Sequence, residues 1–401
     1  MSEFDAYAHL NLKRNDDGTI DRLLHFPPAK PNADPNSGES VLSKDIILNE
    51  EKDLKIRLYL PLKHISKGNR IPIIFYFYGC HWVQFSGDNP ALHKDRQWTA
   101  SSLPAIIILV LYRLAPDCRL PGQYEDAADA VMWLKNQASD PDGDPWVREY
   151  GDFSKCFFSG SNNGGNIAFN TALRLMDSDL KPLKFIGIIL NQPLFGGKQR
   201  TKSEIRYATD QIIPLPALDL VWELVLPKAI DKDHRYCNPV IEGPHQDKMK
   251  LLPPCLILGY GMDPLIDRYQ MLVEMLISHG VKVEAHFSDV GFHRIEIIDS
   301  NRRVEMLTHI KMFIRSKLVS QSQIATCRDQ DASQIATSRD QDQSQIATCR
   351  DQDQSPTATC RDQDASQIAT CGDQDASVSS EEHGKNVSGG DQDEDRVETM
   401  Q

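Results

Sequence analysis

Long apolar runs are absent from this sequence. No stretch of eighteen uninterrupted apolar residues occurs among its 401 residues, and the first fifteen, MSEFDAYAHLNLKRN, mix charged and apolar side chains. A membrane-spanning helix needs about 20 mostly apolar residues, and a secretory signal needs an apolar centre. The sequence therefore predicts a protein without membrane contacts, located in the cytosol or the nucleus.

Closely spaced cysteines are absent as well. The nine cysteines are an odd number, and none belongs to a Cys-x-x-Cys pair; they stand at positions 80, 118, 156, 237, 255, 327, 349, 360 and 371. This usage is typical of free thiols in a reducing compartment and not of a disulfide framework or a zinc site. We therefore predict neither a metal nor a cofactor.

An excess of positive charge is also missing. The net charge is −13, and residues 322–401 account for −11 of it, with six Lys and Arg against seventeen Asp and Glu. The remainder of the chain is nearly neutral, whereas a nucleic-acid surface needs a basic patch. We predict a small-molecule ligand or substrate as the partner and no nucleic acid; the oligomeric state stays open.

The acidic C-terminal segment is repetitive. Five tandem units of eleven residues start at residue 322, and the first reads SQIATCRDQDA. A period of eleven also occurs in right-handed coiled coils. Each unit offers at most one Ile and no Leu, so its folding would bury too little apolar surface to offset the lost conformational entropy. We therefore predict a disordered, low-complexity tail over residues 319–401.

What the sequence does contain is an alternation of strands and helices. Strands are predicted at 43–49, 55–61, 71–77, 104–111, 156–159, 185–191, 255–259 and 281–287, and helices at 124–137, 166–176, 268–279 and 300–317. The runs IPIIFYF and PAIIILVL are those of strands buried on both faces. Such an alternation predicts an α/β domain over residues 41–318, with a mostly parallel sheet between helices and an antiparallel pair at its edge.

Two segments depart from this alternation. Residues 1–40 are predicted to form an N-terminal arm or cap and a connector, since four prolines stand between positions 27 and 35. Residues 197–249 interrupt the strand–helix order with aromatic and aliphatic side chains. We interpret that segment as a helical cap inserted over the carboxyl edge of the sheet.

The stretch FFSGSNNGGNIA, from Phe157 to Ala168, is predicted to be a strand, a sharp turn and a helix. This is the context in which G-x-S-x-G forms a nucleophile elbow, and Gly160, Gly164 and Gly165 stand where the elbow needs small residues. The position of the nucleophile holds Asn162. Asparagine tolerates the positive φ of such a turn, so the turn can persist without a nucleophile.

Four separated segments resemble one family. They are YRLAPDCRLPGQYEDAADAVMWL from Tyr112, WVREYGDFSKCFFSGSNNGGNIA from Trp146, GYGMDPLID from Gly259 and DVGFHRIE from Asp289. They resemble plant carboxylesterases of the hormone-sensitive-lipase branch of the α/β-hydrolases, which also include the gibberellin receptor, 2-hydroxyisoflavanone dehydratase and several alkaloid cyclases. The resemblance covers about residues 10–318 and implies an α/β-hydrolase fold with a helical cap.

The resemblance implies a set of site residues. The acid is Asp263, the base is His293, and Asn162 stands at the position of the nucleophile. A carboxamide cannot be deprotonated by imidazole or form an acyl-enzyme, and loss of the nucleophile of a serine protease costs about 10⁶ in turnover. Ser161 as a substitute nucleophile, and deamidation of Asn162 to aspartate, remain open but less favoured alternatives.

The loop implied to bind an oxyanion departs from the family pattern too. The family has His-Gly-Gly-Gly where this chain has Tyr78-Gly79-Cys80-His81. Backbone amides of Gly79, Cys80 and His81, with that of Asn163, are expected to form the oxyanion hole, since preorganised N–H groups stabilise a developing oxyanion. Cys80 is interpreted as a buried inert thiol, and its use as a nucleophile is the alternative.

These residues predict a carboxylesterase-like protein that acts on a small, largely apolar plant metabolite. With ordinary serine-esterase hydrolysis weakened or lost, His293 and Asp263 favour acid–base chemistry such as elimination, dehydration or cyclisation. The alternatives are a catalytically inactive, receptor-like binding protein and a decayed esterase paralogue.

Overall fold

The computed structural model describes residues 4–320. The eleven-residue repeats lie outside the described residues, as does the predicted disordered tail except for residues 319 and 320. Those two residues belong to a helix over residues 300–320. Along this helix the side chains of Leu307, Ile310 and Phe313 are buried.

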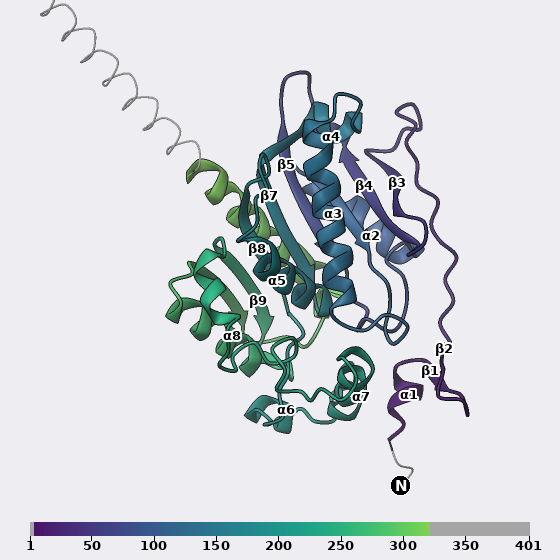
Figure 1. The fold of residues 1–401 in the computed structure, drawn as a ribbon, viewed down its shortest axis with the longest axis vertical. Coiled ribbons are helices and arrows are strands. Elements are labelled where there is room, and N and C mark those ends of the chain that lie inside the picture. Colours follow the sequence, from purple (N-terminus) through teal and green to yellow (C-terminus); the bar gives the residue numbers. More distant parts are fainter. Residues whose placement is uncertain (1–3, 321–401) are drawn as a thin grey trace, which may run out of the picture. The chain divides into compact units, whose positions relative to one another are not determined.

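A sheet of eight strands forms the centre of the described part (Figure 1). Its order is β10-β9-β8-β7-β5-β6-β4-β3, and neighbours from β10 to β6 are parallel, whereas β4 runs antiparallel to β6 and to β3. The mostly parallel sheet and its antiparallel edge are thus confirmed. The strands are β3 Val41–Asn49, β4 Leu54–Pro61, β5 Ile71–Phe77, β6 Ile106–Leu111, β7 Gly151–Ser161, β8 Phe185–Asn191, β9 Cys255–Tyr260 and β10 Val283–Ser288.

Helices cover both faces of this sheet. On one face lie α3 (Gly122–Ser139), α5 (Asn163–Leu175) and α8 (Ile266–Ser278), whose buried residues join those of β5 and β9 in one apolar cluster. On the other face, α2 (Pro90–Ser102) and the helix over residues 300–320 pack against a second cluster. Figure 1 shows α3 and α5 in front of the sheet and α2 behind it.

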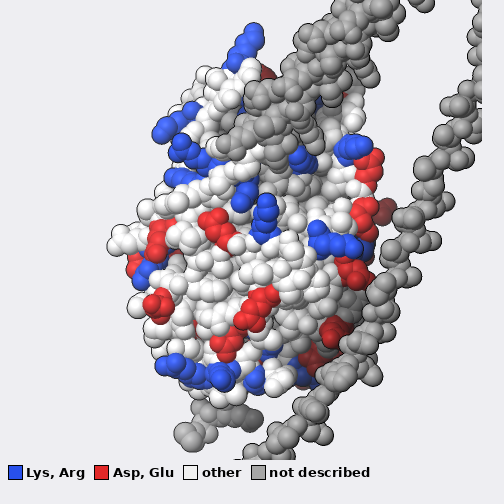
Figure 2. All heavy atoms as spheres, turned by 90° about the vertical axis from the view of Figure 1, so that its left-hand side faces the viewer, with Lys and Arg blue, Asp and Glu red and all other residues white. Residues whose placement is uncertain are grey.

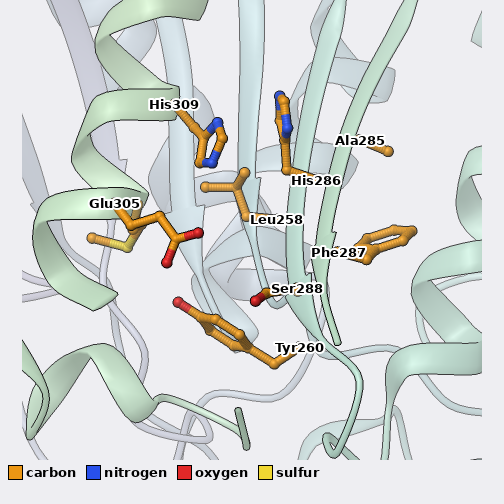
Figure 3. A pocket seen from close by; sticks show the side chains of 10 residues that line it. Leu258, Tyr260, Ala285, His286, Phe287, Ser288, Glu305 and His309 are labelled. Carbon is orange, nitrogen blue, oxygen red and sulfur yellow. The ribbon is translucent and has the colours of Figure 1, made fainter. Parts of the chain in front are cut away.

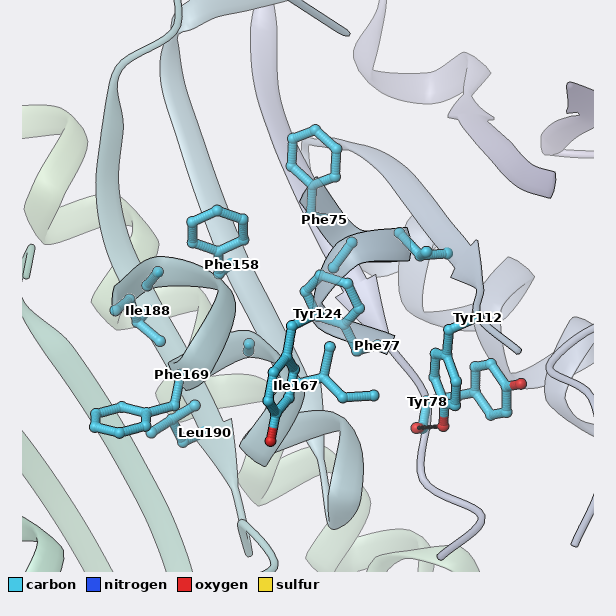
Figure 4. Close-up of a cluster of buried hydrophobic side chains, with 14 of the residues drawn as sticks. Phe75, Phe77, Tyr78, Tyr112, Tyr124, Phe158, Ile167, Phe169, Ile188 and Leu190 are labelled. Carbon is cyan, nitrogen blue, oxygen red and sulfur yellow. Dashed lines mark hydrogen bonds between the residues drawn. The ribbon is translucent and has the colours of Figure 1, made fainter. Parts of the chain in front are cut away.

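Aromatic rings fill the larger apolar cluster (Figure 4). The rings of Phe158 on β7 and Phe185 on β8 stack with their centroids 4.0 Å apart, and Phe75 on β5 lies 6.0 Å from Phe158. Burying one such side chain contributes about 1.5–3 kcal/mol. These contacts pack β7 against both of its neighbouring strands, and β7 is the strand that leads to the sharp turn.

The N-terminal segment contains regular structure that the sequence did not predict. A short helix α1 (Ala6–His9) precedes a hairpin of β1 (Leu12–Arg14) and β2 (Ile20–Arg22), which pair antiparallel. Leu10 and Leu12 are buried. The Arg22 guanidinium donates to the carbonyls of Val83 and Ala115 at 2.8 and 2.7 Å, which fixes the hairpin to the main domain.

The segment over residues 197–249 contains two helices, α6 (Lys202–Arg206) and α7 (Leu215–Val225). The apolar face of α7 buries Leu218, Val221 and Trp222. The remaining short elements are α4 (Pro145–Tyr150), η1 (Leu62–His64), η2 (Gln246–Leu251) and η3 (Ile295–Ile297).

Two surface properties follow from the described residues. Among residues 4–320, no helix combines the length and the apolar character needed to cross a bilayer. On the face shown in Figure 2, Lys and Arg predominate near the top and along the lower edge and Asp and Glu lie between them, so no field of one sign covers the whole face.

Candidate active site

The turn between β7 and α5 has the geometry expected of a nucleophile elbow. Asn162 stands at its apex with φ of 53° and ψ of −125°. A Cβ atom at Gly160 would lie 2.1 Å from the carbonyl oxygen of Gly164, and one at Gly164 would lie 2.0 Å from that of Phe77. No L side chain fits at such distances, so both glycines are required for the turn. The helix begins at Asn163, three residues earlier than predicted.

Asn162, His293 and Asp263 form a continuous hydrogen-bonded row. Nδ1 of His293 lies 2.8 Å from Oδ2 of Asp263, and Nε2 of His293 lies 2.7 Å from Nδ2 of Asn162. Because the amide nitrogen of Asn162 can only donate, Nε2 accepts its hydrogen bond, and the proton of the neutral imidazole is on Nδ1. All three residues are fully buried. The structure thus brings together the three residues that the sequence assigned to the site.

Asp263 is held by two further donors. The backbone N–H of Leu265 donates to Oδ1 at 2.9 Å, and the hydroxyl of Tyr269 donates to Oδ2 at 2.8 Å. Burial, followed by the charge of Asp263, raises the pKa of Tyr269 well above its usual value, so this hydroxyl keeps its proton. The carboxylate therefore faces His293 in a fixed orientation.

The loop that carries His293 is fixed by residues that the sequence analysis did not identify. The backbone N–H of Arg294 donates to Oε1 of Gln192 at 2.5 Å, and the Arg294 guanidinium donates to the carbonyl of Gly79 at 2.9 Å. The buried carboxylate of Glu296 accepts from the amides of Asn191 and Gln192 at 3.0 and 2.9 Å. The sequence contains a signal for Glu296, because this residue stands in the recognised segment GFHRIE. It contains no signal for the partners of Glu296, which lie about 100 residues away.

Only some of the backbone N–H groups predicted to form the oxyanion hole are free to bind a ligand. The N–H of Cys80 donates to Oδ1 of Asn163 at 2.7 Å, and Nδ2 of Asn163 donates to the hydroxyl of Tyr112 at 2.8 Å. The Cys80 amide is therefore already used within the protein. The N–H of Asn163 lies in the first turn of α5, where backbone donors have no helical acceptor. The four residues predicted for the hole do lie together, but they do not offer four free donors.

The thiol of Cys80 is buried, which raises its pKa above the usual value. Sγ lies 3.5 Å from the hydroxyl of Tyr112. A buried thiol with a raised pKa carries almost no thiolate at neutral pH. The structure therefore favours the inert thiol over a cysteine nucleophile.

His81 and Trp82 adopt strained backbone conformations. Their φ angles are 54° and 63°, a region that favours glycine. Nδ1 of His81 lies 3.1 Å from Oε1 of Gln84, which can only accept, so His81 donates from Nδ1. Burial is the main reason why the pKa of His81 falls to about 3. At neutral pH His81 is uncharged, and its Nε2 offers a lone pair instead of a proton.

Unpaired polar atoms gather in this region. Ten buried side-chain nitrogen or oxygen atoms of the described residues have no hydrogen-bond partner, and five of them belong to residues 78–82, to the row or to Arg294 beside it. Buried polar atoms are normally paired, so this grouping sets the region apart from the rest of the described interior. The five are Oη of Tyr78, Nε2 of His81, Nε1 of Trp82, Oδ1 of Asn162 and Nε of Arg294.

Ser161 belongs to a different environment. Its Oγ lies 3.2 Å from the hydroxyl of Tyr76 and accepts from Nδ2 of Asn191 at 3.4 Å. It lines a small space of about 30 Å³ together with residues of α2 and of the helix over residues 300–320. These two helices cover the face of the sheet that is opposite to α5. This placement argues against Ser161 as the partner of His293.

A cavity of about 630 Å³ adjoins the loop. Its walls come from residues 20–26 of the N-terminal segment and from residues 84–89. Gln84, which contacts His81, is one of its lining residues. Close by, the ring of Trp82 lies 5.3 Å from that of Trp222 on α7, so a helix of the 197–249 segment contacts the loop directly.

A second cavity lies between β10 and the helix over residues 300–320 (Figure 3). The imidazoles of His286 and His309 stack there with centroids 3.9 Å apart, and Glu305 faces the same space. Within residues 4–320, however, no three His, Cys, Asp or Glu side chains are arranged to hold a metal ion.

The strand order and the row at the end of β7 define a class of protein. A mostly parallel eight-stranded sheet, a sharp turn after a central strand and an acid–histidine pair on later loops are features of the α/β-hydrolase fold. Residues 74–296 match the family model described as alpha/beta hydrolase fold.

Comparison with known proteins identifies a family within this class. The chain is 44% identical over 315 residues to "Probable carboxylesterase 9" of Arabidopsis thaliana, covering 78% of this chain and 97% of that protein. It is 42% identical to "3-O-acetylpapaveroxine carboxylesterase CXE2" of Papaver somniferum, covering 68% and 90%. A hyperthermophilic esterase from Pyrobaculum calidifontis shares the fold, with a TM-score of 0.58, 24% identity and coverage of 69% and 86%. The chain belongs to the carboxylesterase family of α/β-hydrolases.

Proposed function

We propose that this protein acts on a small, largely apolar plant metabolite in the cytosol or nucleus by acid–base chemistry, without an acyl-enzyme. Asn162 occupies the position of the nucleophile, His293 is the base and Asp263 orients it. The amides of Gly79, His81 and Asn163 bind a substrate oxygen, and the 197–249 segment serves as the cap. The observation that carries the proposal is the intact pair of Asp263 and His293 beside a residue that cannot be acylated.

The chemistry follows from the tautomer of His293. Its Nδ1 proton is directed to Asp263, so the Nε2 lone pair is the basic site, and Asp263 stabilises the imidazolium that forms. Once substrate displaces the Asn162 amide from Nε2, His293 removes a proton next to a carbonyl. The released electron pair forms a carbon–carbon double bond, and the leaving group on the neighbouring carbon departs with its bonding electrons. Imidazolium then returns the proton to that group.

A second function, ligand binding without turnover, is favoured by a specific observation. Nε2 of His293 already accepts from Asn162, and the whole row is buried. A base whose lone pair is occupied is inactive until that contact breaks. In a receptor-like protein the same contact would persist when the ligand is bound.

The test is mass-spectrometric turnover of a panel of plant esters and hydroxylated metabolites. Wild type, His293→Ala and Asn162→Ser are compared, with Ser161→Ala as the matched control because Ser161 lies outside the row. The proposal expects at least one conversion by the wild type that His293→Ala slows by about 10²-fold or more, as for loss of a general base. Conversions that are unchanged in His293→Ala would refute it.

The binding alternative gives a different result in the same panel. It expects a compound that raises the melting temperature of the wild type while yielding no product over hours. If no compound is converted and none stabilises the protein, both functions fail and a decayed paralogue remains.

A further inference from the structure

A third cavity is lined by the C-terminal half of α5, away from Asn162, which is the N-cap of this helix. Its volume is about 340 Å³, within the range of small-molecule sites. Asn170, Leu173 and Arg174 line it from α5, and these positions lie on one face of a helix. The other walls come from Tyr124 on α3 and from the segment between Arg235 and Lys248.

The charges around this cavity are unbalanced. It is lined by three cations, those of Arg174, Arg235 and Lys248, and by no carboxylate. Lys248 pairs with Asp177 at 2.6 Å, and Arg174 only approaches Glu125 at 3.9 Å.

Arg235 is the least compensated of the three. Within the described part of the chain it forms no ion pair with a carboxylate, and its guanidinium lies 4.6 Å from the ring centre of Tyr236. After burial, its charge is the next cause that lowers the pKa of His234. Its only side-chain hydrogen bond among the described residues is to the hydroxyl of Tyr236, at 3.4 Å.

The walls between these cations are apolar and aromatic. The rings of Tyr124 and Tyr236 meet edge to face at 5.0 Å, and Leu173 and Pro244 complete the wall. The hydroxyl of Tyr124 donates to Asn166, so its orientation is fixed. A rigid aromatic wall beside a cationic rim suits a planar apolar molecule that carries an anion at one end.

We propose that this cavity binds a small organic acid, with its planar apolar body against Tyr124, Tyr236 and Leu173. Its carboxylate or phosphate faces Arg235, with Arg174 and Lys248 at the rim. The arginine fork provides paired donors for either oxyanion. This site is separate from the row at Asn162 and does not depend on the function proposed there.

The experiment measures binding by isothermal titration calorimetry to the full chain. The probes are 2-naphthoate, 1-naphthyl phosphate, inorganic phosphate and the neutral 2-naphthalenemethanol. We expect one or both naphthyl anions to bind with the neutral compound at least about 10-fold weaker, since hydrogen bonds to a charged group are stronger than those to a neutral one. The two anions distinguish a carboxylate site from a phosphate site, and inorganic phosphate shows whether the apolar body is needed.

Arg235→Gln is the decisive variant, because it removes the charge at a partly exposed position and keeps most of the side chain. It should weaken binding of the anion by about 10-fold or more. Arg315→Gln, an exposed arginine on the helix over residues 300–320, is the matched control and should bind as the wild type does.

Three outcomes would overturn the proposal. They are equal binding of the neutral compound, binding that Arg235→Gln leaves unchanged, and binding that is lost in His293→Ala but kept in Arg235→Gln. The last outcome would assign the ligand to the row at Asn162. Because none of these readouts requires turnover, failure of this site and failure of the proposed function can be told apart.

Discussion

The elbow and the loop at residues 78–82 reach their unusual backbone conformations in different ways. At the elbow, Gly160 and Gly164 meet the steric demands of the turn, and Asn162 takes its positive φ. In the loop, His81 and Trp82 hold positive φ angles without being glycine, and both carry an unpaired buried nitrogen. At the elbow, the backbone shape is set by the packing around the two glycines, whatever side chain stands at position 162. The loop is the opposite case, because His81 and Trp82 hold their positive φ angles at a cost in strain.

The largest effect is expected from Gly164→Ala at the elbow. The new Cβ would meet the carbonyl oxygen of Phe77 at 2.0 Å, so the turn or the strand must move. We expect a loss of about 4 kcal/mol or more in the free energy of unfolding, or no soluble protein. Gly18→Ala, where no atom lies within 4 Å, is the control, and urea unfolding should show a loss of only about 1 kcal/mol. Equal losses would mean that the elbow is not sterically special.

The next effect concerns catalysis. In Asn162→Ser a hydroxyl replaces the amide that now lies 2.7 Å from Nε2 of His293. We expect the rate of p-nitrophenyl acetate hydrolysis to rise by about 10³-fold, part of the 10⁶ that a nucleophile supplies. Adding His81→Gly should give a further increase of about 10²-fold if the strained loop limits the oxyanion hole.

Initial rates measure this effect, and Ser161→Ala in the Asn162→Ser background is the control. A rate that stays at the wild-type level in Asn162→Ser, but rises in the double variant, would show that the loop and not the elbow is the deeper change. A rise that depends on Ser161 would contradict the assignment of the row.

A smaller effect of the loop is expected in the pH dependence of the free energy of unfolding. The pKa of His81 is about 3 in the folded protein and about 6.5 in the unfolded chain, so between these values only the unfolded chain binds the proton. Stability is therefore full above pH 6.5 and falls as the pH decreases, by about 2 kcal/mol at pH 5 from this group. Urea unfolding of wild type and His81→Gly at pH 7.5 and 5 measures it. A loss that is identical in both proteins would exclude His81 as its source.

The smallest effect returns to the elbow. Asn162→Ala removes the hydrogen bond to His293 but keeps a Cβ atom at φ of 53° and ψ of −125°, a backbone conformation that favours glycine. We expect a loss of about 1 kcal/mol in the free energy of unfolding, and a smaller loss in Asn162→Gly. Thermal unfolding of the two variants in parallel checks this expectation. If Asn162→Gly is at least as destabilising as Asn162→Ala, the contribution of Asn162 to stability comes from its contact with His293 and not from its backbone conformation.

The sequence predicted the parts of this molecule that have local signals. β5, β6 and α3 were predicted because their apolar patterns have the length and period of buried elements. Helix α2 was missed because PALHKDRQWTASS contains few apolar residues and its packing is decided by the fold. The small helix and hairpin at the N-terminus were missed for a similar reason.

The site shows the same division. Asn162, Asp263 and His293 stood in recognisable segments, so they could be assigned to one site before any coordinates. The contact of Cys80 with the side chain of Asn163 joins residues 83 positions apart, and nothing in either segment announces it. Pairings of this kind arise from tertiary packing and are invisible to a pattern that repeats every two or four residues.

The contact between Trp82 and Trp222 gives the molecule an optical property. Two indole rings, one in the loop and one on α7, lie with their centroids 5.3 Å apart, so each ring is part of the surroundings of the other. Any separation of α7 from the loop therefore changes the intrinsic fluorescence of the protein. Opening of this region can be followed in real time without attaching a dye.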